Sequence, residues 1–138
     1  MKIAPGIHRI GDNGMINAYL IEQAGEVTII DAGVSGFYKD IDRELAAMGR
    51  TPADVRALVL THGHTDHIGF AERLRRERRV PVSVHEADAA LARGEVPNPA
   101  KGYGPVKLGP RAPPRLLLVQ RPARRAAHPQ AAAGRDLR

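Results

Sequence analysis

The chain has 138 residues, of which 43% are hydrophobic and 4% aromatic, so one domain with a mainly aliphatic core is expected. It contains no cysteine, which excludes disulfides, thiolate metal sites and a cysteine nucleophile. The first six residues lack the apolar region of a signal peptide, and no run approaches the roughly 20 apolar residues of a membrane span. We therefore expect a cytoplasmic protein without a membrane partner.

Charge is distributed unevenly along the chain. Residues 1–100 hold 12 Lys and Arg against 14 Asp and Glu, whereas residues 101–138 hold nine against one. The second segment is also rich in Pro and Ala, a composition that disfavours helices and central strands. We therefore divide the chain into a globular part, residues 1–104, and a basic tail, residues 105–138, which we expect to be disordered.

The first elements are predicted to be strands followed by a helix. Residues 3–10 and 15–22 favour a hairpin, because turn-forming residues separate them. Residues 26–30 form a short apolar run, which indicates a buried strand. Apolar residues at spacings of four, four and three predict an amphipathic helix over residues 37–48.

Strands and helices alternate in the following segment. Residues 56–60 and 80–84 are predicted strands, while residues 66–79 and 85–93 are predicted helices. This order, with long apolar runs in the later strands, is typical of a sheet covered by helices. The predicted fold class is therefore α/β.

Three histidines and an aspartate follow the strand predicted at residues 56–60. They occur in the segment Thr61-His62-Gly63-His64-Thr65-Asp66-His67. His62 and His64 are two residues apart, so they can face the same side of an extended chain. Asp66 and His67 come slightly later in the chain, so their side chains can converge on a second position nearby.

This donor set is typical of a metal site. Imidazole and carboxylate together suit zinc, with iron or manganese as alternatives. Single histidines such as His8 and His85 are more often structural or exposed. A cluster of four titratable side chains at a strand exit is different, because its burial is costly unless a ligand satisfies it. We therefore expect two divalent ions, zinc being favoured.

The cluster also resembles a known family signature. The segment from Leu60 to Gly69 resembles the His-x-His-x-Asp-His signature of the metallo-β-lactamase superfamily and is complete at each ligand position of that signature. Residues 15–21, 29–33 and 80–88 resemble neighbouring strand segments of the same superfamily. The resemblance covers roughly residues 3–100.

The resemblance implies a fold and a set of residue roles. The fold is an αβ/βα sandwich of two similar halves, of which only the first is recognisable. His62 and His64 are implied ligands of the first metal, and Asp66 and His67 of the second. Asp66 is also the implied catalytic residue, which orients the metal-bound hydroxide or accepts its proton. Asp31 is implied to brace the loop from the outer shell, with a simple loop cap as its alternative.

The implied activity is hydrolysis of an ester, a thioester as in glyoxalase II, or a related bond. A non-catalytic remnant that still binds metal is one alternative, and a nuclease or nucleic-acid-binding member of the superfamily is another. A small-molecule substrate is favoured over nucleic acid, because Glu72 and Glu77 interrupt the arginines of the helix predicted at residues 66–79.

The later ligands of the family have no clear counterpart. No Gly-His pair follows His67, and His128 is the one remaining candidate metal ligand, in an Arg/Ala/Pro-rich setting. A frameshift near residues 105–112 is our hypothesis for this tail. A chain without the second half is expected to be weakly active or inactive, and to expose an apolar sheet face. The oligomeric state is left open.

Overall fold

The computed structural model describes residues 1–11 and 14–98. The expectations for the basic tail, including His128, lie outside the described residues. Within them, no helix is long and apolar enough to cross a bilayer.

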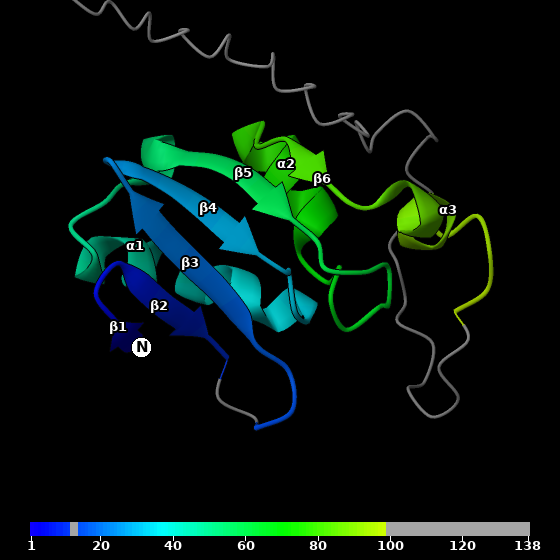
Figure 1. Ribbon diagram of the computed structural model, residues 1–138, viewed down its shortest axis with the longest axis horizontal. Coiled ribbons are helices and arrows are strands. Elements are labelled where there is room, and N and C mark those ends of the chain that lie inside the picture. The colour runs from blue at the N-terminus through cyan, green and yellow to red at the C-terminus, as the bar shows by residue number, and fades with distance from the viewer. Residues whose placement is uncertain (12–13, 99–138) are drawn as a thin grey trace, which may run out of the picture.

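The described part is built on one six-stranded sheet, whose strands lie in chain order (Figure 1). The first four strands pair antiparallel, whereas β4 pairs with β5 and β5 with β6 in parallel. This mixed sheet with helices confirms the predicted α/β class. The strands are β1 (Lys2–Ala4), β2 (Ile7–Ile10), β3 (Ala18–Gln23), β4 (Glu26–Ile30), β5 (Val55–Val59) and β6 (Val82–Ser83).

The segment predicted as one strand, residues 3–10, forms two strands instead. Pro5 cannot donate to a sheet ladder, and Gly6 has a φ of +69°, so the chain turns between β1 and β2. The hairpin predicted to follow is confirmed: β2 pairs with β3, from Ile7 opposite Ile21 to Ile10 opposite Ala18.

The helices lie mainly on one face of the sheet (Figure 1). A 3₁₀ helix over Ser35–Asp40 leads into α1 (Ile41–Ala47). The first residues of the helix predicted over residues 37–48 are therefore 3₁₀ and not α-helical. Further along the chain come α2 (Ala71–Arg78) and the short α3 (Ala89–Ala92). Shorter 3₁₀ turns cover Pro52–Asp54 and Glu86–Asp88.

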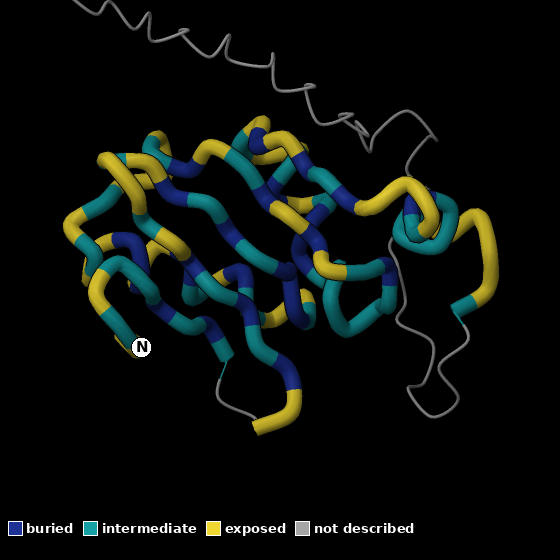
Figure 2. Tube along the Cα trace, viewed as in Figure 1, coloured by how far each residue is buried: buried dark blue, intermediate teal, exposed yellow. Residues whose placement is uncertain are grey.

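The core fills the space between these helices and the sheet. Strand register places Leu20, Ile29 and Leu58 side by side in one row, and each is fully buried. Leu45 of α1 and Leu74 of α2 belong to the same cluster. Figure 2 shows buried positions alternating with more exposed ones along β2, β3 and β4. The alternation follows from side chains pointing to opposite faces at successive strand residues.

The opposite face of the sheet is apolar but less covered. In the next register row, Tyr19 lies opposite Ile30, and Ile30 beside Val59. Val59 and Ile21 are each 37% exposed. Among the described residues, this face therefore presents aliphatic side chains to solvent.

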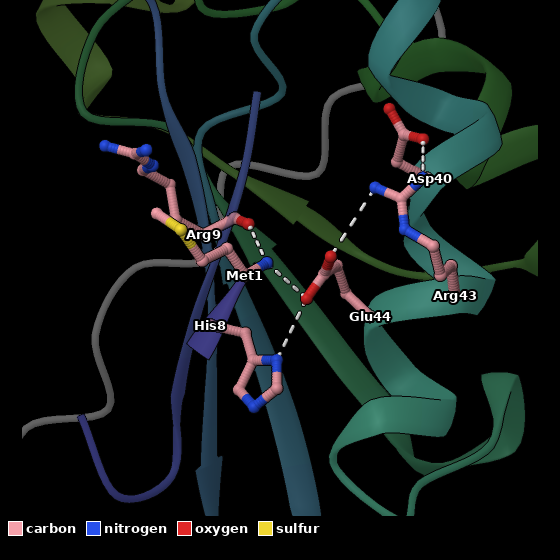
Figure 3. A network of polar contacts seen from close by, with 6 residues as sticks. All are labelled: Met1, His8, Arg9, Asp40, Arg43 and Glu44. Atoms are coloured by element: carbon pink, nitrogen blue, oxygen red, sulfur yellow. Dashed lines mark hydrogen bonds and ion pairs between the residues drawn. The ribbon is translucent and has the colours of Figure 1, made fainter. Parts of the chain in front are cut away.

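A buried polar contact joins the sheet to α1 (Figure 3). His8 is buried, and its Nδ1 lies 3.0 Å from Oε2 of Glu44, which is buried as well. The same oxygen pairs with the α-ammonium group of Met1. His8 therefore has a structural role, one of the two alternatives expected for it.

Candidate metal centre

The histidine motif lies where two parallel strands end. Asp31 directly follows β4, and its backbone N–H donates to the carbonyl of Val59 at the end of β5 (2.9 Å). Leu60 in turn donates to the carbonyl of Ser83 in β6 (2.8 Å). Because parallel strands end at one edge of a sheet, the motif and the loop after β4 come together there (Figure 1).

Three backbone hydrogen bonds join the second half of the motif to the loop after β4. Ala32 N–H donates to the carbonyl of His67 (2.7 Å), and Gly69 N–H to that of Gly33 (2.8 Å). Phe70 N–H donates to the carbonyl of Ala32 (3.2 Å). The backbone groups of His67, Gly69 and Phe70 thus bond to the loop after β4 and not within a helix, so α2 begins only at Ala71. The expectation that the helix starts at Asp66 is wrong for this reason.

Two glycines permit close packing around the motif. A Cβ on Gly69 would lie 2.5 Å from Cα of Val34, which real side chains do not tolerate. A Cβ on Gly63 would lie 2.8 Å from the backbone nitrogen of Ala92 in α3 and 2.9 Å from the carbonyl oxygen of Asp88. Gly63 therefore does more than separate two histidines, since it lets the motif pack directly on α3.

The three histidine rings of the motif are gathered together. The ring centroids of His62 and His67 are 3.9 Å apart, and those of His62 and His64 are 4.6 Å apart. Nε2 of His67 lies 3.6 Å from Oδ2 of Asp66. All four side chains are partly buried. The structure thus brings together the four side chains that the sequence singled out.

Asp31 contacts the motif at two residues, Thr61 and His67. Asp31 is 6% exposed, and its carboxylate accepts a hydrogen bond from Thr61 N–H (2.7 Å). The Thr61 hydroxyl lies 3.0 and 2.8 Å from the two carboxylate oxygens. Nδ1 of His67 lies 2.9 Å from Oδ2 of Asp31. The carboxylate therefore joins the first and last residues of the motif.

Sequence reasoning did not single out Thr61 as functional. Its hydroxyl also lies 3.0 Å from Nδ1 of His62. The one signal in the sequence was its position next to His62. Its partner Asp31 is 30 residues away, and only folding brings the two together.

The electrostatic surroundings of His62 favour its neutral imidazole form. Burial lowers the pKa of His62, and the neighbouring rings of His67 and His64 lower this pKa further, against the opposing effect of the carboxylates. A neutral imidazole is the form that binds a metal ion.

The donor chemistry fits a divalent cation, because imidazole and carboxylate groups converge on one part of the surface. Within residues 1–11 and 14–98, no group of three such side chains is arranged to hold one ion.

His85 is exposed, and its Nδ1 accepts a hydrogen bond from Ala87 N–H (3.2 Å), as expected of a residue at a helix start.

Comparison with known families identifies one match. A family model described as the metallo-beta-lactamase superfamily matches residues 11–130, which is most of the chain. The matched range extends past residue 104, into the segment that sequence analysis assigned to a basic tail.

Individual relatives agree with this family. The chain is 31% identical over 86 residues to YybB, a probable metallo-hydrolase of Bacillus subtilis, covering 62% of this chain and 37% of that protein. It is 35% identical over 103 residues to ribonuclease J 1 of Streptococcus pyogenes, covering 66% of this chain and 18% of that protein. Among solved structures, the Rm3 metallo-beta-lactamase has a TM-score of 0.63 at 26% identity, covering 84% of this chain and 42% of that one.

These comparisons bear on two expectations. The chain spans between 18% and 42% of the length of these three proteins. One of those relatives is a ribonuclease, which conflicts in part with the expectation that a small-molecule substrate is favoured over nucleic acid.

Proposed function

Because this chain belongs to the metallo-β-lactamase superfamily, we propose that it carries the metal-binding half of a hydrolase site. The observation that carries the proposal is the gathering of three imidazole rings and a carboxylate at one sheet edge. The proposed metal ligands are His62, His64, Asp66 and His67.

The residues have separate tasks in this proposal. His62 and His64 would hold one divalent cation, and His67 with Asp66 would hold the other. When bound, such cations act as Lewis acids that polarise a substrate oxygen and activate water. The Asp66 carboxylate orients the attacking water and accepts its proton. Zinc is the proposed metal, because nitrogen and oxygen donors in this combination suit it.

The proposed substrate is a small molecule with an ester or thioester bond. The similarity to YybB, a probable metallo-hydrolase, supports hydrolysis in general. The proposed assignment supplies two ligands for each ion, whereas catalytic zinc sites commonly use three. We therefore expect slow turnover by the chain as it stands.

The test is a comparison of two histidine variants of the full chain. We expect wild-type protein to bind zinc and to hydrolyse a generic thioester or ester. His64→Ala should lower turnover at least about 100-fold, since even outer-shell changes in metal sites cost about 10–100-fold. His85→Ala is the matched control and should change neither zinc content nor turnover, because His85 is exposed and its ring accepts a hydrogen bond within its own turn.

Two outcomes would contradict the proposal. If both variants retained full turnover, the measured activity would be background hydrolysis. If wild-type protein bound zinc but turned over no substrate in the panel, the chain would be a non-catalytic metal-binding remnant.

A nuclease activity is the second candidate, favoured by the 35% identity to ribonuclease J 1. The chemistry of metal-assisted attack is shared by carbonyl and phosphoryl centres, so the same cluster serves either substrate. A short single-stranded RNA therefore belongs in the substrate panel. Cleavage of this RNA by wild-type protein, lost in His64→Ala, would select this candidate.

A further inference from the structure

The hydroxyl group of Thr61 lies between a buried carboxylate and a histidine ring. It is 2.8 Å from Oδ2 of Asp31 and 3.0 Å from Nδ1 of His62. Its backbone N–H separately donates to Oδ1 of Asp31 (2.7 Å). The residue is exposed as a whole, so these contacts are not a by-product of core packing.

Proton counting assigns a direction to each of these contacts. A carboxylate at neutral pH only accepts hydrogen bonds, so the single hydroxyl proton of Thr61 goes to Asp31. The hydroxyl oxygen then offers only a lone pair to His62. Nδ1 of His62 must therefore carry the proton of that contact. In a neutral imidazole this leaves the lone pair on Nε2.

The same carboxylate orients a second ring without an intermediary. Nδ1 of His67 lies 2.9 Å from Oδ2 of Asp31, so it also carries a proton. Nε2 of His67 is turned toward Asp66, 3.6 Å from its Oδ2. One buried carboxylate thus sets both rings, directly for His67 and through the Thr61 hydroxyl for His62.

From this geometry we propose that Thr61 is a positioning residue, whose hydroxyl holds His62 as the Nδ1–H tautomer and presents Nε2 as the ligand atom. The inference rests on the proposed function in one respect, which is that the species bound by Nε2 of His62 is a metal cation. Outer-shell partners of this kind fix the orientation and the tautomer of a ligating histidine.

The test uses two substitutions that keep the backbone N–H. Thr61→Val preserves the side-chain shape without the hydroxyl, and Thr61→Ser preserves the hydroxyl. Long-range proton–nitrogen NMR of the imidazoles in metal-free protein reads the tautomer of His62 directly. A chelator-competition titration reads zinc affinity. Circular dichroism confirms that each variant is folded.

We expect wild-type and Thr61→Ser protein to show His62 protonated at Nδ1. Thr61→Val should show a mixture of both tautomers and bind zinc about 10–100-fold more weakly. The tautomer of His67 should stay unchanged in all three proteins, because its contact with Asp31 does not involve the hydroxyl.

Three results would overturn the inference. One is a wild-type His62 protonated at Nε2, a result that needs no variant to fold. Another is Thr61→Val with an unaltered tautomer, and the third is Thr61→Ser behaving like Thr61→Val. Absence of zinc binding in wild-type protein would instead contradict the proposed function, while the tautomer measurement in metal-free protein would still judge Thr61.

Discussion

Asp31 combines an unusual backbone conformation with a buried charge. Its φ is +61°, in the left-handed region that aspartate tolerates better than most residues with a side chain. This turn directs the carboxylate toward Thr61 and His67 rather than toward solvent. The bracing role expected for Asp31 stays a prediction, and its hydrogen bonds to the motif support it.

Glu44 gives a residue-scale prediction on pH. Burial tends to raise the pKa of Glu44, but hydrogen bonds and charge from the N-terminal ammonium and His8 outweigh burial and leave the pKa lowered. A carboxyl whose pKa is lower in the folded state stabilises the fold above its unfolded pKa. That stability is lost as the pH falls through the folded pKa.

We therefore expect Glu44→Gln to flatten the acid limb of the stability curve. Urea unfolding from pH 7 down to pH 3 measures this, since the wild-type free energy of unfolding should fall more steeply than that of Glu44→Gln. Asp54→Asn is a useful comparison, because Asp54 is a partly exposed carboxylate whose pKa is lowered mainly by hydrogen bonds from Thr51 within its own capping turn. Parallel curves for wild type and Glu44→Gln would show that the His8–Glu44 contact is not coupled to folding.

At the scale of elements, the loop after β4 and the motif segment form one interlocked unit. The backbone hydrogen bonds of Ala32, Gly69 and Phe70 join residues more than 30 positions apart. Gly69 makes this approach possible, because its Cβ position is already occupied by the backbone of Val34 and Gly33. The position of Asp31 relative to the histidines therefore depends on a glycine that is not itself a ligand.

Gly69→Ala should destabilise the fold by about 1–3 kcal/mol, the usual cost of overpacking a filled site. Gly36→Ala is the matched control, since its Cβ would meet nothing within 4 Å. Chemical denaturation of both variants measures the difference. We also expect weaker zinc binding in Gly69→Ala, through the displaced motif. If Gly69→Ala and Gly36→Ala were equally stable, the loop after β4 and the motif segment could move apart without lowering the free energy of unfolding.

At the scale of the whole molecule, the two faces of the sheet differ in how well they are covered. Residues of one face contact the helices and are fully buried, as Val27 is. Residues of the other face are apolar and partly exposed, as Val59 is at 37%. An apolar sheet face of this kind promotes association and binding of hydrophobic dyes.

Valine and threonine have almost the same shape, so a valine-to-threonine substitution on each face of the sheet compares how deeply the two faces are buried. Val59→Thr should change the free energy of unfolding by no more than about 0.5 kcal/mol. It should also lower dye fluorescence and concentration-dependent light scattering. Val27→Thr buries an extra hydroxyl and should cost about 1–3 kcal/mol. A large destabilisation by Val59→Thr would show that this face is packed in solution.

The sequence alone determined the α/β class and the family resemblance, and it singled out the four candidate donor residues. It could do so because strand runs and the spacing from His62 to His67 are local patterns, which any single chain displays. The role of His8 was left between structural and exposed, because the identity of its partner Glu44 depends on how α1 packs.

Only the tertiary structure decided where α2 begins and how the histidines are held. Both depend on hydrogen bonds between distant segments, such as that of Gly69 with Gly33 and that of Thr61 with Asp31. A helical pattern from Asp66 onward is locally favourable. The loop after β4 nevertheless takes up the backbone groups of Gly69 and Phe70, and a competing partner of this kind is invisible to local periodicity.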